Sequence, residues 1–275
     1  MVALGVLALD GASLAGVINI GADGSGLPPP SGKASAEEIK LSTDNASAAA
    51  PPTTAPAPAT SSPRAASDAR TSCDAVTYIG DSTSLGMIMD SFLPDPDQRL
   101  DAQFARVGAT SQHLEISAAR SIVETLPGQT NGEEVARQLV KEGFRGCWVL
   151  ALGTDDTANV YMGSQVGRME RIERMMSAVG NQPVLWVNMR TLLEGGPYSE
   201  ANMELWDSTL EEACAKYPNM RVFDWASGVN DGWFISDGVH FTSEGYAQRA
   251  HLTADALVHA FPTSGGEESS GCVVH

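Results

Sequence analysis

Residues 75–84 read AVTYIGDSTS, a short apolar run that ends in a Gly-Asp-Ser turn. Three later stretches repeat this pattern of an apolar run followed by turn or polar residues: CWVLALG (147–153), PVLWVNM (183–189) and MRVFDW (220–225). A run that is apolar throughout is typical of a strand buried on both faces, as in parallel sheets. We therefore expect these four runs to be strands of one parallel sheet.

Helical patterns separate these strands. They cover residues 82–92, 111–125, 132–142, 164–179, 199–216 and 242–261. A weaker run, LDAQFARV at 100–107, is expected to add a fifth strand. Strands that alternate with helices are joined by right-handed crossovers, which place helices on both faces of the sheet. The sequence thus predicts an α/β fold over residues 73–262, a three-layer αβα sandwich around a central five-stranded parallel sheet.

The flanking segments differ from this domain in composition. Residues 1–22 are mostly apolar, which indicates a signal or anchor segment, although Asp10 interrupts the run. Residues 23–72 are rich in Ala, Pro, Ser and Thr and predict a disordered linker. Residues 263–275 form a tail that contains Cys272. We expect a secreted or cell-envelope protein of a bacterium, with the N-terminus as a membrane tether; a cytoplasmic protein with an apolar leader is the alternative.

The charge balance excludes several partners. Against 34 acidic side chains the chain has 17 basic ones, a formal net charge of −17. A nucleic-acid binder needs clustered Lys and Arg, and so does a peripheral protein on an anionic membrane. We therefore expect no nucleic-acid partner.

Four cysteines allow three disulfide pairings. Cys73 and Cys147 each precede a predicted strand, so their sulfurs lie at the same sheet edge if those strands are neighbours. We therefore expect Cys73–Cys147, with Cys214–Cys272 holding the tail; four unpaired thiols are the alternative. The sequence has no C-x-x-C pair, which argues against structural zinc and thioredoxin-like chemistry.

Chemically active residues follow the predicted strands. GDS at 80–82 comes directly after the first strand, Asp155 follows the strand expected at 147–153, and Asp237 and His240 lie in the loop before the last helix. Ligands of parallel sheets bind beyond the carboxyl ends of the strands, so these side chains are expected to converge. A serine hydroxyl is a weak nucleophile until a histidine takes its proton. The spacing lets Asp237 orient the His240 ring, and a helix N-terminus at Ser82 favours an oxyanion.

Four motifs resemble those of the SGNH (GDSL-type) hydrolase superfamily, which has a flavodoxin-like fold. They are GDSTS (80–84), Gly108 in RVGATS, GTDD (153–156) and DGVHFT (237–242). The resemblance implies that Ser82 is the nucleophile, His240 the general base and Asp237 its orienting partner. It also implies an oxyanion hole made by the backbone N–H groups of Ser82 and Gly108, with neither a metal nor an organic cofactor. The G-x-S-x-G elbow of the α/β-hydrolases is absent from the sequence.

Three further stretches are most similar to extracellular SGNH domains of bacterial envelope O-acyltransferases and to secreted actinobacterial SGNH proteins. They are WVNMRT (186–191), YPNMRVFDWA (217–226) and DGVHFTSEGY (237–246). This resemblance implies a serine esterase or O-acyltransferase that forms an acyl-enzyme. We expect a monomer. Its substrates would be acyl esters, acetyl esters above all, of envelope glycans or lipids. Candidate substrate contacts are Asp81, Asn159, Asn188, Arg190 and Trp233.

Asp155 departs from the family pattern Gly-x-Asn, in which the Asn amide helps to hold the oxyanion. An ionised carboxylate has no proton to donate. Three interpretations are open. Asp155 is protonated in a dry site; it turns away, and backbone donors serve with Asn159 or Asn188; or the protein is a weak or inactive module that binds acylated glycan.

A metal-dependent phosphoesterase is an alternative from another class, because carboxylate oxygens suit divalent cations. Its ligands would come from Asp81, Asp155, Asp156, Asp237 and His240. A lone serine among these acids fits acyl chemistry better.

Overall fold

The computed structural model describes residues 69–263 and 271–275. The expected export segment at 1–22, most of the expected linker and residues 264–270 lie outside the described residues. Thr71 is buried, and its hydroxyl donates to the carbonyl oxygen of Phe261 at 2.8 Å. The folded domain therefore includes residues just before Cys73. None of the helices in the described ranges is both long enough and apolar enough to span a bilayer.

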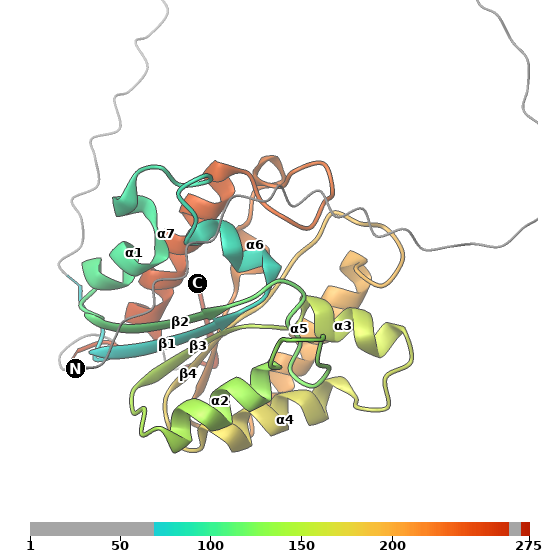
Figure 1. Cartoon of the computed structure of the whole chain (residues 1–275), viewed down its shortest axis with the longest axis horizontal. Helices are drawn as coiled ribbons and strands as arrows, with labels where there is room; N and C mark the ends of the chain where they lie inside the picture. The colour runs from blue at the N-terminus through green and yellow to red at the C-terminus, as the bar shows by residue number, and fades with distance from the viewer. Residues whose placement is uncertain (1–68, 264–270) are drawn as a thin grey trace, which may run out of the picture. The chain divides into compact units, whose positions relative to one another are not determined.

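A parallel sheet forms the centre of the domain, with strand order β2-β1-β3-β4-β5-β6 (Figure 1). Its strands are β1 (Ala75–Gly80), β2 (Ser111–Ile116), β3 (Cys147–Ala151), β4 (Val184–Val187), β5 (Met220–Phe223) and β6 (Val273–Val274). The described residues thus contain six strands, not the expected five. The chain runs outward from β1 to β2 and then crosses back to β3, so the strand order reverses between β1 and β3. In open α/β sheets such a switch point opens a crevice at the carboxyl ends of the strands.

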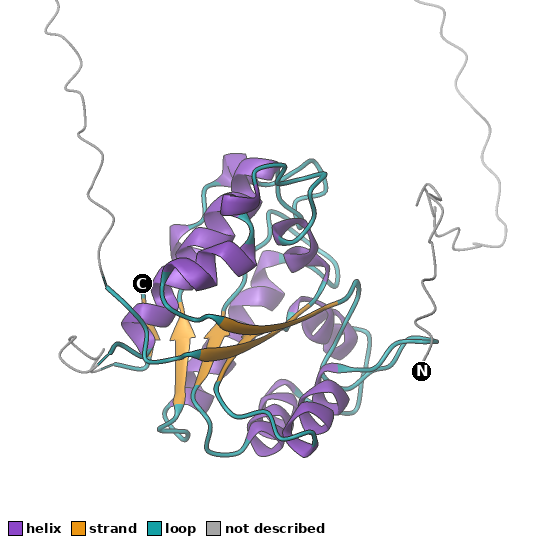
Figure 2. Cartoon of the chain, turned by 60° about the vertical axis from the view of Figure 1, so that its left-hand side comes forward, coloured by secondary structure: helices purple, strands orange, loops and turns teal. Residues whose placement is uncertain are grey.

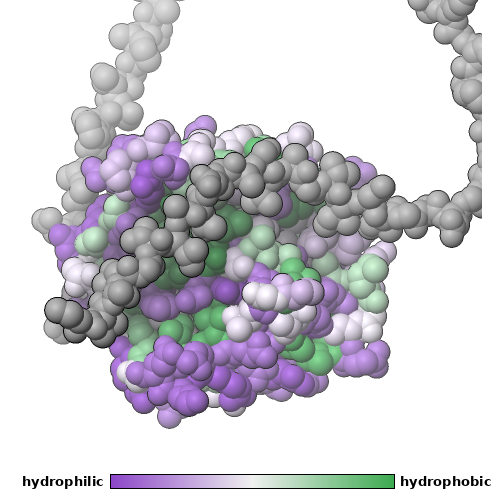
Figure 3. Space-filling view, in the orientation of Figure 1, coloured by the Kyte–Doolittle hydropathy of each residue, from purple (hydrophilic) through white to green (hydrophobic). Residues whose placement is uncertain are grey.

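Helices cover both faces of the sheet (Figures 1 and 2). The helices are η1 (Ser82–Met87), η2 (Pro96–Gln98), α1 (Leu100–Arg106), α2 (Gly132–Lys141), α3 (Thr154–Tyr161), α4 (Arg168–Val179), α5 (Glu200–Cys214), α6 (Trp225–Gly228), η3 (Asp231–Trp233) and α7 (Ser243–Ala260). Helices α1 and α7 pack on one face, and α2, α4 and α5 on the other. Tyr78 of β1 enters the first core and Ile79 the second, because successive strand side chains point to opposite faces. The outer surfaces of α2 and α4 are strongly hydrophilic (Figure 3).

The segment 100–125 differs from the sequence prediction. Residues 100–107 were expected to be a strand, but they contain helix α1, in which Leu100 and Phe104 share the buried face. Their four-residue spacing is that of a helix. Residues 111–125 were expected to be a helix but begin with β2, whose side chains are exposed to half-buried because it is an edge strand. A half-buried edge strand carries polar residues, so it lacks the apolar signal of the inner strands.

Two disulfides join Cys73 to Cys147 and Cys214 to Cys272, which confirms the expected pairing. Cys147 pairs with Val76 across β1 and β3, so the first disulfide joins the amino-terminal ends of two adjacent strands. The second disulfide attaches residues 271–275 to the end of α5. Strand β6, which lies in this segment, pairs with β5. This attachment accounts for the sixth strand, because two residues form too short a strand to be predicted from sequence.

Candidate active site

The turn after β1 presents Ser82. β1 ends at Gly80, and Ser82 is the first residue of the 3₁₀ helix η1. The Asp81 carboxylate caps this helix, since its Oδ1 accepts hydrogen bonds from the Thr83 N–H at 2.9 Å and the Thr83 hydroxyl at 2.6 Å. A β-carbon on Gly80 would lie 2.6 Å from the Ser84 hydroxyl oxygen, so only glycine fits there. Among the described residues the Ser82 N–H has no acceptor, which leaves it free for a ligand.

A continuous chain of hydrogen bonds links Ser82 to His240 and Asp237. The Ser82 Oγ lies 2.8 Å from His240 Nε2, and His240 Nδ1 lies 2.8 Å from Asp237 Oδ2. With Nδ1–H donating to the carboxylate, Nε2 is the ring atom that accepts the serine proton. The backbone N–H groups of Val239 and His240 both donate to Asp237 Oδ1 at 2.9 Å. Partial burial raises the pKa of Asp237, but these hydrogen bonds outweigh it and hold that pKa below its usual value.

The prediction that Gly108 contributes to the oxyanion hole is wrong. Gly108 precedes β2, and Ser111 at the start of β2 pairs with Ala75 at the start of β1. It therefore lies at the amino edge of the sheet, roughly 17 Å along the strand from the edge that carries Ser82. Its N–H donates to the Ala105 carbonyl at 3.1 Å and closes helix α1 instead.

The residues that follow β2 occupy the place expected of Gly108. The Ser117 N–H donates to the Gly80 carbonyl at 3.2 Å, which brings this loop beside the Ser82 turn. Next come Ala118 and Ala119, whose N–H groups donate to no acceptor in the part of the chain that the structure describes. Ala119 has φ 53°, the one positive value among described residues other than glycine. We found no sequence signal for this position, because left-handed backbone is expected of glycine.

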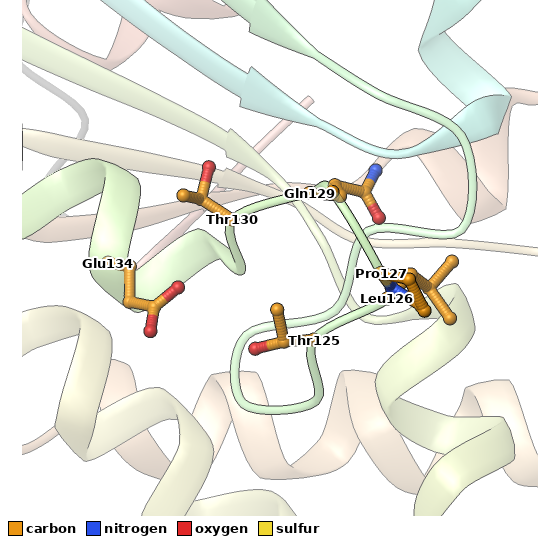
Figure 4. Close-up of a pocket in the computed structure, with 7 residues that line it drawn as sticks. Thr125, Leu126, Pro127, Gln129, Thr130 and Glu134 are labelled. Carbon is orange, nitrogen blue, oxygen red and sulfur yellow. The ribbon is translucent and has the colours of Figure 1, made fainter.

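The loop beyond Ala119 is attached to the same edge. Gln129 donates from Nε2 to the Ala118 carbonyl at 2.8 Å and also to the Ser117 hydroxyl. Residues 125–130, with Glu134 at the start of α2, line a cavity of about 540 Å³ (Figure 4). Gln129 thus connects the wall of this cavity to the free N–H groups near Ser82.

Asp155 lies in the first turn of α3, directly beyond β3, and is only 9% exposed. Its Oδ1 accepts a hydrogen bond from the Tyr198 hydroxyl at 3.1 Å, whereas its buried Oδ2 has no partner among the described residues. Burial raises the pKa of Asp155 most, and the charge of Asp81 raises it further, to about 8. Asp155 has not turned out to solvent, and its burial favours the protonated form of its carboxyl.

The two asparagines considered as substitute donors are used elsewhere. The Asn188 amide donates to Asp224 at 2.9 Å and accepts from the Ala226 N–H at 2.8 Å. The Asn159 amide donates to Glu124 at 3.0 Å. Each amide thus has a structural partner.

A buried ionic network lies behind Asp155. Arg171 is fully buried and contacts Asp156 at 2.7 Å, Glu124 at 2.6 Å and the Ser164 hydroxyl at 2.8 Å. Asp156 also accepts from the Ile122 N–H at 2.9 Å. The network ties α3 and α4 to the loop after β2, so it positions both sides of the site. Sequence analysis had not identified Arg171, since a buried arginine has no local signature.

Arg190 and Trp233 lie near the site but have structural partners. Arg190 forms an ion pair with Asp231 at 2.7 Å and lines a cavity of about 680 Å³. The Leu192 N–H in the wall of that cavity donates to the Gly238 carbonyl at 2.8 Å, so the cavity adjoins the Asp237–His240 loop. Trp233 is half-buried and stacks on Trp225 with ring centroids 5.8 Å apart.

The acids proposed as metal ligands do not converge. In residues 69–263 and 271–275, no group of three His, Cys, Asp or Glu side chains is arranged to hold a metal ion. Asp156 pairs with Arg171, and Asp237 pairs with His240. These side chains therefore bond to separate partners and do not face a common metal position within the described residues.

Comparison with known proteins identifies the fold. No family model matches the sequence, and no curated protein matches it significantly. A lipase/acylhydrolase from Enterococcus faecalis superposes with a TM-score of 0.52 at 16% identity, covering 70% of this chain and 98% of its own. A carbohydrate acetylesterase from Sinorhizobium meliloti superposes with a TM-score of 0.51 at 18% identity, covering 68% and 99%. Another carbohydrate acetylesterase family member from that organism gives 0.50 at 16% identity, covering 67% and 98%. The chain has the SGNH hydrolase fold.

Proposed function

We propose that this protein is a serine esterase or O-acyltransferase that acts on acyl esters through Ser82, His240 and Asp237. The observation that supports the proposal most directly is the hydrogen-bonded chain from Asp237 through His240 to Ser82, with both links at 2.8 Å. This is the geometry in which a histidine deprotonates a serine and a carboxylate stabilises the resulting imidazolium. The position of Ser82 just beyond the carboxyl end of β1 also supports the proposal, because ligands of open α/β sheets bind at that edge.

The reaction proceeds in two halves. The Ser82 Oγ attacks the ester carbonyl while His240 Nε2 takes the hydroxyl proton, and the carbonyl oxygen becomes an oxyanion. The free N–H groups of Ser82 and Ala118 stabilise that charge. The intermediate collapses with transfer of the proton from His240 to the departing alcohol, which leaves an acyl-enzyme. Water or a sugar hydroxyl then attacks with its proton passing to His240, and Ser82 is regenerated as the acyl group leaves.

The exposure of the site favours water as the acceptor. The His240 side chain is 34% exposed and that of Asp237 is 45% exposed. A transferase has to keep water from the acyl-enzyme until its acceptor binds, and such exposure gives little exclusion. Hydrolysis is therefore the default outcome, with transfer to a sugar hydroxyl when an acceptor fills the cavity next to Arg190.

The substrate class is inferred as acetyl or other short acyl esters of envelope glycans or lipids. Two of the structures with this fold are named carbohydrate acetylesterases. The cavity beside the Asp237–His240 loop is lined largely by polar side chains, including Arg190, Glu200 and Asp231, which suits a substrate rich in hydroxyls. Two disulfides fit an oxidising compartment and support export, with residues 1–22 as the signal or tether.

Turnover of p-nitrophenyl acetate by the full chain tests the proposal. The Ser82→Ala variant should lose about 10³-fold or more in kcat/KM, because the nucleophile is removed. Ser208→Ala is the matched control, since Ser208 is an exposed serine on α5. A fluorophosphonate probe should add its mass to Ser82 in the wild type even when acyl transfer needs a missing acceptor. Neither turnover nor labelling above the Ser82→Ala level would reject the serine mechanism and favour a binding module.

A further inference from the structure

Two adjacent buried acids, Asp155 and Asp156, have different neighbours. Asp156 has a cation beside it, since the Arg171 guanidinium lies 2.7 Å from its carboxylate. Burial raises the pKa of Asp156 to about 7, and the charge of Arg171 opposes that rise. Asp155 has no cation within ion-pair distance among the described residues, although it is 9% exposed. An unpaired buried carboxylate is costly, and such a group takes up a proton instead. Asp155 is therefore a neutral acid, which both accepts and donates a hydrogen bond.

The partners of Asp155 account for only one of these roles. Oδ1 accepts from the Tyr198 hydroxyl, whereas Oδ2 is buried and unpartnered. The charged and titratable groups around it are Asp81 from the turn after β1, Tyr198 from the loop before α5 and Asp156 on α3 itself. Asp81 accepts two hydrogen bonds from Thr83 and also faces the positive charge of Arg249 on α7. Burial raises the pKa of Asp81 as well, whereas the hydrogen bonds from Thr83 and the charge of Arg249 lower it. These contacts favour the negative charge on Asp81 and the proton on Asp155.

The position of Asp155 places this unused donor at the reacting centre. The Asp81 N–H donates to the Ala151 carbonyl at 3.4 Å, so the turn that carries Ser82 leaves β1 beside the end of β3. Asp155 lies four residues beyond Ala151, in the first turn of α3. Both turns lie at the switch point between β1 and β3, where the oxyanion forms on a substrate attacked by Ser82.

We propose that Asp155 is a catalytic residue in its neutral acid form, donating a hydrogen bond from its carboxyl proton to the oxyanion of the tetrahedral intermediate. The inference rests on the proposed function. The donor is unsatisfied in the free protein and gains its acceptor only when charge develops on the substrate, so the interaction stabilises the transition state more than the ground state. It also gives the enzyme an alkaline limit, because deprotonated Asp155 repels the oxyanion.

The test is the pH dependence of kcat/KM for p-nitrophenyl acetate, measured on the full chain. Wild-type kcat/KM should fall about tenfold per pH unit above pH 8 as the acid form is lost. Asp155→Asn, whose amide donates at every pH, should lack this alkaline limb. Asp155→Ala should lose about 10²- to 10³-fold below pH 8, the usual effect of removing one oxyanion donor. Asp207→Asn is the matched control: it removes a half-buried acid whose pKa burial also raises, and should retain the limb.

A second measurement determines the protonation state of Asp155 without relying on catalysis. In Ser82→Ala protein, the ¹³C shift of the Asp155 carboxyl should report the neutral acid at pH 7. An ionised carboxyl at pH 7 overturns the inference, as does an alkaline limb that Asp155→Asn shares with the wild type. Failure of the proposed function is distinct, because wild-type turnover would then equal that of Ser82→Ala, and the inference would fall with it.

Discussion

Replacing Asp155 by Asn should stabilise the protein, by an amount that depends on pH. The folded protein holds the Asp155 proton up to about pH 8, whereas the unfolded chain releases it near pH 3.8. Because the pKa is raised on folding, the stability from this site is complete below pH 4 and is lost as pH rises to about 8. Each pH unit in this window costs roughly 1.4 kcal/mol, so wild type carries a penalty of about 4 kcal/mol at pH 7.

The asparagine amide does not titrate, so the stability of Asp155→Asn has no such dependence on pH at this site. Urea unfolding followed by tryptophan fluorescence, with the disulfides intact, gives the free energy of unfolding of each protein. The stability difference between Asp155→Asn and wild type should widen by about 3 kcal/mol from pH 5 to pH 7. Ser82→Ala removes no acid, so its difference from wild type should stay constant over that range. A constant difference for Asp155→Asn as well would mean that Asp155 is ionised in the folded protein, and would refute the reasoning.

Two further predictions concern the scaffold. Removing the Cys73–Cys147 disulfide as the Cys73→Ser, Cys147→Ser double variant should lower the free energy of unfolding by about 4.5 kcal/mol, from the loop entropy of its 74-residue separation; a loss below about 1 kcal/mol in urea would contradict this. Arg171→Met should destabilise the protein by about 3–5 kcal/mol, because it leaves Asp156 buried without its cation. Adding Asp156→Asn to Arg171→Met should restore part of that stability, and a double variant no more stable than the single one would show that the charge of Asp156 is not the cause.

Local sequence was sufficient for the inner strands and the disulfides. It also singled out Ser82, Asp237 and His240, which the structure joins by hydrogen bonds and whose catalytic role stays a prediction. The strands β1, β3, β4 and β5 are buried on both faces, so they are apolar throughout and stand out in the chain. Ser82 follows a strand directly. Asp237 and His240 are three residues apart and bond within one loop. Once the parallel order of β1 and β3 was predicted, the positions of Cys73 and Cys147 followed.

The edge of the sheet and the oxyanion site depend on tertiary structure. β2 is an edge strand, so its polar sequence resembles a helix, while α1 resembles a strand. Because residues 100–107 were predicted as the second strand, its carboxyl end was placed at Gly108. That glycine lies at the opposite edge of the sheet from Ser82. The free N–H groups of Ala118 and Ala119 have no signature, because any residue carries one.

Asp155 shows most clearly which information comes from the sequence and which comes only from the tertiary structure. Sequence alone determined that an acid stands after β3, and left open whether it is protonated, turned away or a mark of lost activity. Only the folded structure shows that Asp155 is buried, bonded to Tyr198 and adjacent to Asp81, while Arg171 pairs with its neighbour Asp156. The protonation state of a carboxyl depends on burial and on charges brought from distant parts of the chain. Those distances exist only after folding, so they are not encoded at any one position.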